Sequence, residues 1–356
     1  MKILLVAPSY HPHVGGVEYV VKSVAERLAK MGHSVAVLAG DPGAERPAEE
    51  EINGVHVIRW PTWAPSGAYH IPIATDKLRK TALDLAKDAD VVHIHSIHAV
   101  FSVYVLKFIR DVKTWKVITP YYHGTGHTPI RKLLWIPWRR YLRKLIPVAD
   151  VIHTVSKLEA SLVRRDFNRE AIPIENGVEE FVKTVSWNPE NYVMYSGRIE
   201  KYKNIHLLAK IVKLLNMRHK TELTLKIFGN GPYKQQLLQI LKRLEVPFEI
   251  GDFQPFNNYI QTLAHATLFG LLSQKESYPQ TINEANAIGV PTLTAPPWGR
   301  NFEGRARTLI IDPTQDVEKI ADEVYQFIQK APHEPPNNVL TWDEVTQMYI
   351  KKLYTP

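Results

Sequence analysis

Short apolar runs alternate with amphipathic stretches through the first half of the chain. Residues 2–7 (KILLVA) are a continuous apolar run, as is typical of a strand buried on both faces of a sheet. Gly15 and Gly16 follow, and apolar residues then recur at helical spacing up to Gly32, which suits a helix end. Further strands are expected at residues 34–39, 55–59, 90–95, 116–119, 150–155 and 171–175. This alternation predicts a parallel sheet with right-handed crossovers.

A second series of the same kind follows residues 183–191 (KTVSWNPEN), whose composition is typical of a linker. Its strands are expected at residues 192–196, 223–228, 246–250, 267–272, 291–295 and 308–311. We therefore predict an α/β protein with two tandem Rossmann-like, doubly wound parallel-sheet domains. The domains would span residues 1–185 and 186–340, followed by a helix within residues 341–356. Such sheets bind ligands beyond the carboxyl ends of their strands, so a cleft between the domains is the expected site.

The length of 356 residues supports two domains, because a single hydrophobic core rarely serves so long a chain. The absence of cysteine excludes disulfides, thiolate metal sites and a cysteine nucleophile. No apolar run approaches the length of about eighteen residues that a membrane span needs. The opening residues are better explained as a buried strand than as a signal peptide, since Pro8 and Pro12 interrupt the apolar stretch. We therefore expect a cytoplasmic protein.

The net charge of +8 and the isoelectric point near 9.3 favour acidic partners such as phosphates, nucleotides or anionic lipid. The basic residues between positions 131 and 144, with no acidic residue among them, are Arg131, Lys132, Arg139, Arg140, Arg143 and Lys144. Trp135, Ile136 and Trp138 stand in the same stretch. One interpretation is a helix with one buried and one solvated face. The other is a surface for a lipid-linked substrate or for peripheral contact with the anionic inner face of a membrane.

Glu276 and Glu284 bracket the segment ESYPQTINE at the start of a predicted helix. Ser277 and Gln280 match a capping box, and Gly289 suits the helix end. Glu276 would then lie in the entering loop and Glu284 about two turns into the helix. The two carboxylates would be about 10–12 Å apart, which suits two contacts along one extended ligand better than a shared proton. Two solvated surface glutamates remain the alternative at this point.

Several residues at the predicted strand ends could meet phosphates. Gly15 and Gly16 lie between the first strand and its helix, although they do not form the G-x-G-x-x-G of a dinucleotide site. Arg198 and Lys203 follow the first strand of the second domain and suit a diphosphate. Gly229 ends another strand, where it would face a ligand or turn the chain. A tight turn at the two glycines and a solvated loop around the cations are the alternatives.

His123 follows the fifth predicted strand, beside glycines that would let a ligand approach closely. A lone histidine is nevertheless more often structural than catalytic. The pair His93 and His95 invites a metal interpretation. We expect the two side chains to point to opposite faces of their strand, so we predict no metal site there.

Taken together, the motifs resemble those of the retaining GT-B glycosyltransferases of family four, the E-x7-E or group 1 type. The resemblance covers essentially the whole chain. It runs through VAPSYHPHVGGVE, HG, TVSK, ENGV, SGRIEKYKN, FGNGP, ESYPQTINEANAIGVP and TWDEV in this order. It implies that the C-terminal helix crosses back to the first domain. It also implies an enzyme that moves a hexose from a UDP- or GDP-linked sugar to a sugar or lipid-linked acceptor.

The resemblance implies a role for each candidate residue. Glu284 would hold the ribose hydroxyls, and Glu276 the hydroxyls of the transferred sugar. Arg198 and Lys203 would bind the diphosphate and stabilise the leaving group. The remaining implied contacts with the donor would come from Gly15, Gly16, His123 and Gly229. No cofactor, metal or nucleic acid is expected.

Charge develops on the leaving nucleoside diphosphate, so preorganised cations would stabilise the transition state. No carboxylate pair is spaced as in a retaining hydrolase, which favours a front-face mechanism over a covalent intermediate. The chain departs from the family pattern at APPWGRNFEG, where a Gly-Gly-x-x-Glu turn is usual, so the sugar is left open. The main alternative is a GT-B-like protein that binds a sugar nucleotide without turnover. A Rossmann oxidoreductase is disfavoured by the missing glycine motif.

Overall fold

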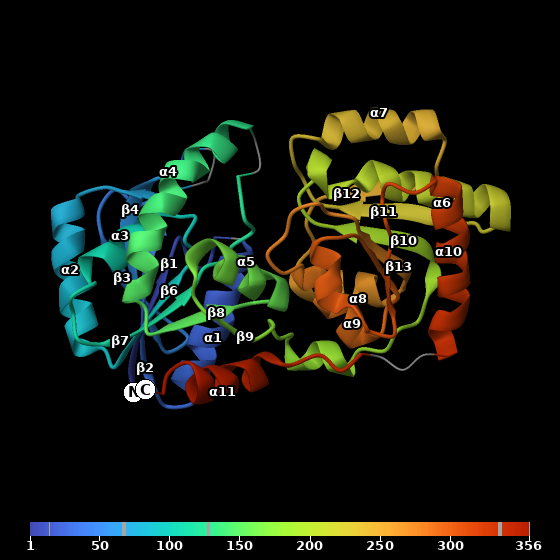
Figure 1. Cartoon of the computed structure of the whole chain (residues 1–356). Coiled ribbons are helices and arrows are strands. Elements are labelled where there is room, and N and C mark those ends of the chain that lie inside the picture. Colours follow the sequence, from blue (N-terminus) through green and yellow to red (C-terminus); the bar gives the residue numbers. More distant parts are fainter. Residues whose placement is uncertain (14, 66–68, 127–128, 334–336, 356) are drawn as a thin grey trace. The chain divides into compact units, whose positions relative to one another are not determined.

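The chain folds into two compact α/β units, each built on its own sheet (Figure 1). The computed structural model describes residues 1–13, 15–65, 69–126, 129–333 and 337–355. Met1–Asn176 and Trp342–Pro356 form the first unit, and Gly177–Thr341 form the second. The chain therefore changes units before residues 183–191, the stretch predicted as a linker.

The first unit contains a nine-stranded sheet, with the strand order β3-β4-β2-β1-β6-β7-β8-β9 and with β5 paired to β4. Its strands are β1 (Lys2–Ala7), β2 (Ser34–Asp41), β3 (Ala48–Ile52), β4 (Val55–Trp63), β5 (Ile71–Pro72), β6 (Val91–His95), β7 (Trp115–Thr119), β8 (Val151–Thr154) and β9 (Ile172–Pro173). The sheet is parallel through its centre, as predicted, whereas β3 and β5 at one edge both pair with β4 in antiparallel fashion. The apolar run of β1 is buried from Ile3 to Ala7, as its sequence predicts.

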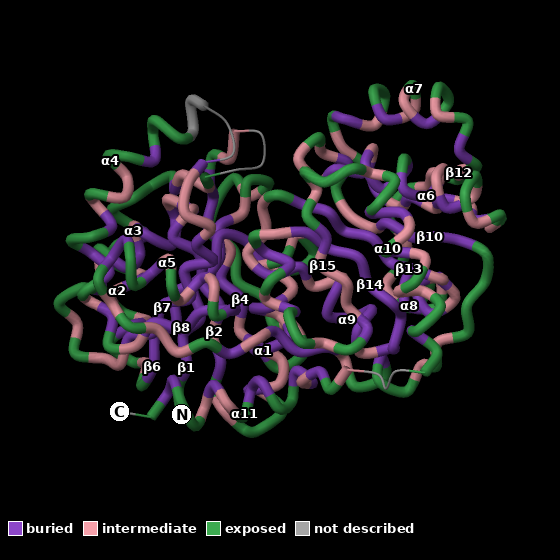
Figure 2. The backbone as a smooth tube through the Cα atoms, turned by 45° about the vertical axis from the view of Figure 1, so that its right-hand side comes forward, coloured by how far each residue is buried: buried purple, intermediate pink, exposed green. Residues whose placement is uncertain are grey.

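The helices of the first unit are α1 (Gly16–Lys30), α2 (Thr75–Asp88), α3 (Val100–Phe108), α4 (Pro129–Leu145), α5 (Lys157–Phe167) and α11 (Trp342–Lys352). The strand order reverses between β1 and β6, so right-handed crossovers place the helices on opposite faces of the sheet. Figure 2 shows the central strands of this sheet as buried chain.

Helix α11 completes the core of the first unit, although it follows the second unit in sequence. The ring centroids of Trp342 and Tyr19 of α1 lie 5.7 Å apart, and Asp343 pairs with Arg27 at 3.2 Å. Beyond the helix, the hydroxyl of Tyr354 lies 2.8 Å from Nδ1 of His93 in the middle of the sheet. The predicted helix at the end of the chain is therefore confirmed, and it belongs to the first unit.

The prediction that His93 and His95 point to opposite faces is wrong. Their ring centroids lie 4.1 Å apart, because residues two positions apart on a strand share a face. Both nitrogens of His93 are hydrogen-bonded, to Tyr354 and to Thr119. Burial lowers the pKa of His95 to about 3 and that of His153 to about 4, so these rings are neutral at neutral pH.

The second unit contains a six-stranded parallel sheet with the order β12-β11-β10-β13-β14-β15. Its strands are β10 (Glu190–Ser196), β11 (Thr224–Phe228), β12 (Phe248–Gly251), β13 (Ala266–Leu271), β14 (Thr292–Thr294) and β15 (Thr308–Ile310). Its helices are α6 (Ile205–His219), α7 (Lys234–Leu244), α8 (Phe256–Ala264), α9 (Gln280–Ile288) and α10 (Val317–Lys330). The two ends of the unit meet, since Val178 N–H donates to the carbonyl of Leu340 at 2.9 Å.

Helix α9 begins later than the sequence predicts. Its first residue is Gln280, Pro279 occupies the N-cap position, and no side chain caps it, so the predicted capping box is wrong. Glu276 lies in the preceding loop, as expected, whereas Glu284 is only the fifth helical residue rather than two turns in. Gly289 ends the helix in the left-handed conformation at φ 91°, which confirms that part of the prediction.

Candidate active site

The centre of the second sheet has the topology of a ligand site. Strand order reverses between β10 and β13, and the crevice outside the carboxyl ends of such a strand pair is where doubly wound sheets bind ligands. The loops that follow these strands are tied together. Gln274 N–H donates to the carbonyl of Tyr202 at 3.0 Å, and the Asn204 side chain donates to the carbonyl of Leu272 at 3.0 Å. The two loops therefore form one fixed surface.

Lys203 and Glu276 form an ion pair across these two loops. The side chains retain 12% and 17% of their exposure, so the pair is mostly shielded from water yet reachable by a ligand. The Nζ atom of Lys203 also lies 5.4 Å from the ring centre of Tyr202, a cation–π contact. Partial burial strengthens an electrostatic interaction, so a cation held here can stabilise a ligand anion better than a solvated one.

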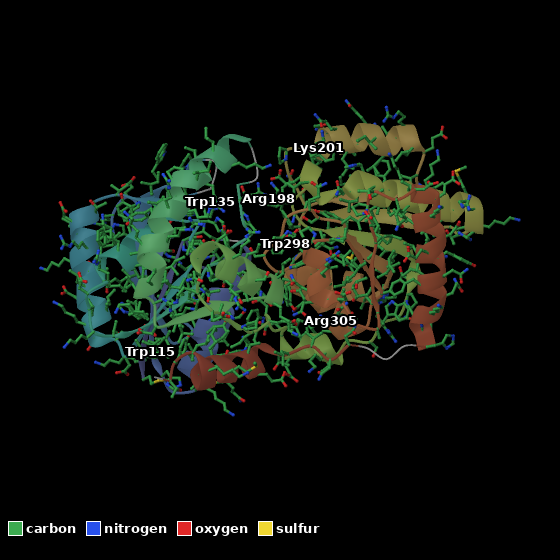
Figure 3. The ribbon with its side chains drawn as sticks, viewed as in Figure 1. Trp115, Trp135, Arg198, Lys201, Trp298 and Arg305 are labelled. Carbon is green, nitrogen blue, oxygen red and sulfur yellow. The ribbon has the colours of Figure 1, made fainter. Side chains whose placement is uncertain are left out.

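Arg198 lies on the same loop as Lys203 but outside the ion pair. Its guanidinium is 70% exposed and lies 3.1 Å from the carboxylate of Glu200. Its backbone is fixed, because the Tyr195 hydroxyl donates to the Arg198 carbonyl at 2.7 Å. Figure 3 labels Arg198 together with Lys201, which begins the short 3-10 helix that ends at Lys203. The loop thus presents a fixed cation at Lys203 and a solvated one at Arg198.

Gly229 allows the loops after β10 and β11 to pack closely. A Cβ atom at Gly229 would lie 2.0 Å from the carbonyl oxygen of Gly197, and the φ angle of 144° is one that favours glycine. Gly231 approaches Ile199 in the same way, with a Cβ position 2.3 Å from its carbonyl oxygen. Close packing between loops is therefore a sufficient reason for glycine at position 229.

Glu284 is set apart from the ion pair, inside the second unit. Only 3% of the residue is exposed, and the hydroxyl of Tyr259 on α8 donates to its carboxylate at 2.8 Å. Burial raises the pKa of Glu284 to about 8, although the Tyr259 hydrogen bond opposes that shift. A carboxyl group that is buried at an energetic cost and held by a tyrosine suggests a functional role.

The unusual loop after β14 is anchored to α9 on either side of Glu284. Arg305 donates to the side-chain carbonyl oxygens of Asn283 and Asn286, at 3.0 and 2.9 Å. Trp298 donates through its indole N–H to the carbonyl of Gln274 at 3.2 Å. Figure 3 labels Trp298 and Arg305. This hydrogen-bonded loop stands where the family pattern has its Gly-Gly-x-x-Glu turn.

In the first unit, Gly15 is the N-cap residue of α1 and Gly16 its first helical residue, so the two glycines lie between β1 and its helix, as predicted. The Glu18 carboxylate folds back over this terminus, since a Cβ atom on Gly15 would lie 2.1 Å from its Oε2, and Ser9 donates to its Oε1 at 2.5 Å. Among the described residues, and apart from the chain neighbours and the backbone of α1 itself, no heavy atom lies within 4 Å of the Cβ position of Gly16. A phosphate at this helix N-terminus would therefore approach on the Gly16 side, next to the Glu18 carboxylate.

His123 lies in the loop that follows β7. The side chain of Glu159 fixes the backbone of that loop through a hydrogen bond. The buried Glu159 carboxylate accepts from Tyr122 N–H at 2.6 Å and from Val155 N–H at 3.0 Å. Burial raises the pKa of Glu159 to about 8 against the effect of these amides. Tyr121 has a φ of 51°, so the backbone turns sharply just before His123.

Helix α4 carries the basic stretch. Along its exposed face, apolar side chains come first in sequence and basic side chains follow. Leu133, Ile136, Arg140 and Lys144 share one side of the helix by their spacing. Leu133, Leu134 and Ile136 are 69%, 59% and 52% exposed, whereas Trp135 is buried on the opposite side. Arg139 pairs with the Asp166 carboxylate at 3.4 Å, and Arg143 donates to the Asp166 carbonyl at 2.7 Å. The side chain of Arg131 lies outside the described residues.

Comparisons with known proteins agree with the fold described above. The family model for Glycosyltransferase Family 4 matches residues 14–180, and the model for Glycosyl transferases group 1 matches residues 178–338. This chain belongs to glycosyltransferase family four. It is thus an enzyme of nucleotide-sugar glycosyl transfer with the GT-B fold, as the motif order predicts.

Two curated relatives of this glycosyltransferase show its range of similarity. A GDP-mannose-dependent alpha-mannosyltransferase of Mycolicibacterium smegmatis is 25% identical over 330 residues, which cover 88% of this chain and 84% of the relative. A GDP-mannose:cellobiosyl-diphosphopolyprenol alpha-mannosyltransferase of Xanthomonas oryzae is 25% identical over 91% of this chain and 86% of its own.

Solved structures share the fold at low sequence identity. Anabaena HepE in complex with UDP and glucose superposes with a TM-score of 0.73 and 15% identity, and covers the full length of both chains. Sucrose-phosphate synthase from Thermosynechococcus elongatus gives a TM-score of 0.71 at 16% identity, over 99% of this chain and 95% of its own. These likenesses establish the GT-B fold.

The structure joins two of the predicted residues of this glycosyltransferase by an ion pair, Lys203 and Glu276. Sequence reasoning missed the side chains that hold the candidates in place, namely Tyr259, Glu159, His98 and Trp135. Ser156 and Glu159 do carry a local signal, since S-x-x-E is a capping box and Glu159 N–H donates to the Ser156 hydroxyl at 3.1 Å. Tyr259 carries none, because its contact with Glu284 spans 25 residues.

Proposed function

We propose that this glycosyltransferase moves a mannosyl residue from GDP-mannose to a lipid-linked carbohydrate acceptor, with retention of configuration and without a metal ion. The ion pair of Lys203 and Glu276 at the β10/β13 reversal carries this proposal. It combines a cation for a diphosphate with a carboxylate for sugar hydroxyls at one point. The names of both relatives above contain GDP-mannose, which supports this donor over a UDP-hexose.

The reaction breaks the bond between the anomeric carbon and the diphosphate oxygen and forms a bond to an acceptor oxygen. Negative charge grows on the departing diphosphate, and Lys203, with Arg198 beside it, would stabilise this charge. Glu276 would orient the mannosyl hydroxyls, and Glu284 would hold the ribose. The acceptor proton would pass to the leaving phosphate oxygen on the same face, so no covalent enzyme intermediate is needed.

The donor proposal predicts selective stabilisation by GDP-mannose. At a concentration of about one hundred times Kd, the melting temperature should rise by about 5 °C, because ligand binding to the folded state adds about 2.7 kcal/mol. UDP-glucose and ADP-glucose at the same concentration should give less than half of this shift. Differential scanning fluorimetry provides the measurement. A larger shift with a UDP-sugar would refute the mannosyl donor.

Turnover is tested in the same preparation by measuring GDP release with polyprenol-linked oligosaccharide acceptors and by NMR of the new linkage. Transfer should continue in excess EDTA and give an α-linked product. A β-linkage would refute retention, and loss of activity in EDTA would refute metal independence. GDP-mannose binding without GDP release from any acceptor would indicate a binding protein.

The exposed side of α4, with Leu133 and Ile136 followed by Arg140 and Lys144, supports peripheral binding of the protein to the cytoplasmic leaflet of a membrane. Within the described residues, no helix combines the length and apolar character needed to span a membrane. Leu133 and Ile136 can enter the boundary between head groups and acyl chains, while Arg140 and Lys144 on the same side face anionic head groups. This arrangement would bring the enzyme to an acceptor whose lipid remains in the bilayer.

Flotation with liposomes tests this surface. The wild-type protein should float with vesicles rich in phosphatidylglycerol at about 0.1 M salt, and the double variant Leu133→Glu, Ile136→Glu should reduce the bound fraction at least tenfold. The loss follows from about 1.5–3 kcal/mol of apolar burial per side chain. Met217→Glu, at a residue 67% exposed on α6, is the matched control and should bind as the wild type does. Equal binding by all three proteins would exclude α4 as the membrane surface.

A further inference from the structure

Three flat rings form a continuous stack in the first unit. The rings of Trp135 and His98 have centroids 4.7 Å apart and planes inclined by 17°. The rings of His98 and His123 have centroids 4.3 Å apart and planes inclined by 14°. His98 is therefore the middle ring, with Trp135 of α4 on one side and His123 on the other. Figure 3 labels Trp135 on α4.

A hydrogen bond also fixes the orientation of the His98 ring. Nε2 of His98 lies 3.0 Å from the carbonyl oxygen of Tyr121, two residues before His123. A carbonyl oxygen can only accept, so Nε2 of His98 carries the proton. The backbone is fixed too, because His98 N–H donates to the Ser96 hydroxyl at 3.3 Å and Ser96 has a φ of 71°.

We infer that His98 is a positioning residue that sets the plane of the His123 ring. Its hydrogen bond fixes the backbone before His123, and its ring fixes the imidazole face. Trp135 supports His98 from the far side, so the position of α4 is transmitted to His123 through stacked rings. This inference rests on the proposed function, because only the family resemblance gives His123 a contact with the donor.

The stacked rings are supported by buried, hydrogen-bonded side chains around them. Trp135 is 8% exposed and belongs to the same buried cluster as Tyr122 and Ile97. The Trp138 indole donates to the Ile97 carbonyl at 2.9 Å, which ties α4 to the segment that carries His98. Because packed interiors resist small displacements, removing one ring should let its neighbour rotate. A misaligned group near a reacting centre can lower the rate about a hundredfold.

Kinetics of ring variants test the inference. His98→Ala should lower kcat thirty- to a hundredfold and change the donor KM less than threefold, because the diphosphate cations lie on other elements. His98→Phe retains the stack and should recover most of the lost rate. Trp135→Leu should resemble His98→Ala, whereas Trp135→Phe should be near wild type. Trp115→Phe, a tryptophan on β7 outside the stack, is the control and should leave kcat unchanged.

A double-variant cycle separates positioning from general weakening. His98→Ala combined with His123→Ala should be no slower than His123→Ala alone, because His98 acts through His123. Multiplicative losses would overturn the inference, as would a His98→Ala enzyme with wild-type kcat.

Histidine NMR tests the geometry without any turnover. The ring-proton resonance of His123, assigned with His123→Gln, should carry a ring-current shift that His98→Ala removes and Trp115→Phe does not. An unchanged resonance in His98→Ala would refute the stack even in an active enzyme. An inactive wild-type protein in which the resonance does shift would instead refute the proposed function and leave the ring geometry intact.

Discussion

Lys203→Ala is expected to lower kcat/KM for glycosyl transfer about a thousandfold, equivalent to about 4 kcal/mol of transition-state stabilisation. The ammonium group lies in a partly shielded site, so its attraction for the departing diphosphate is stronger than that of a solvated cation. Its effect should appear mainly in kcat, because the charge on the diphosphate increases as the sugar bond breaks. Initial rates of GDP release over a range of donor concentrations give both constants.

The chain offers a close control for this measurement. Lys201 lies two residues earlier in the same short 3-10 helix and is exposed, so Lys201→Ala removes the same charge from the same loop. It should lower kcat/KM less than fivefold. Equal effects of the two substitutions would mean that the loop contributes only a general positive field. Near wild-type activity of Lys203→Ala would remove the ion pair from the mechanism.

Glu284→Gln is expected to weaken donor binding while stabilising the fold. At pH 8.5, where most of the Glu284 side chain is ionised, the donor KM should rise about a hundredfold, because a carboxylate can accept from two ribose hydroxyls and an amide offers a single acceptor oxygen. The free energy of unfolding should rise by roughly 2–4 kcal/mol at pH 8.5, since glutamine removes the cost of a buried charge. A substitution that raises stability and lowers function is typical of an active-site residue.

The pH dependence of this stability follows from the pKa of Glu284, about 8 in the fold against 4.5 in a model peptide. Between these values the folded state holds a proton that the unfolded state has lost, so the wild-type protein loses stability as pH rises. The advantage of Glu284→Gln should therefore be absent below pH 4.5, grow to about pH 8 and then level off. Urea titrations at several pH values measure it, with the exposed Glu323→Gln on α10 as control. A pH-independent difference would contradict the assigned pKa.

Much of the fold follows from the sequence because buried parallel strands have a simple signature. The run at β1 and the matching runs at β10 and β13 are buried on both faces of their sheets. Strand β3 was missed for a physical reason. Its sequence, AEEEI, has no buried face, and it exists because it pairs along the edge of β4. Propensity cannot reveal a strand that a neighbour induces.

The candidate site also has a part that the sequence predicts and a part that it does not. The order of strands and loops was enough to expect Lys203 and Glu276 at one edge of a sheet, although they are 73 residues apart. The stack at His98 could not be predicted, because it unites a loop after β6, a loop after β7 and a face of α4. Neither the spacing of His98, His123 and Trp135 along the sequence nor their residue types predicts such a contact. The start of α9 differs from the prediction because Pro279, and not Ser277, is its N-cap residue.

The closed ends of the second unit affect how the protein is made. Translation completes residues 177–341 before residues 342–356, which hold the last helix of the first unit. A nascent chain can therefore finish its second unit while the first still lacks the aromatic side chains of Trp342, Tyr349 and Tyr354. During that interval the apolar surface of α1 that α11 later covers is open to chaperones. The amino-terminal unit, first to emerge from the ribosome, is the last to be complete.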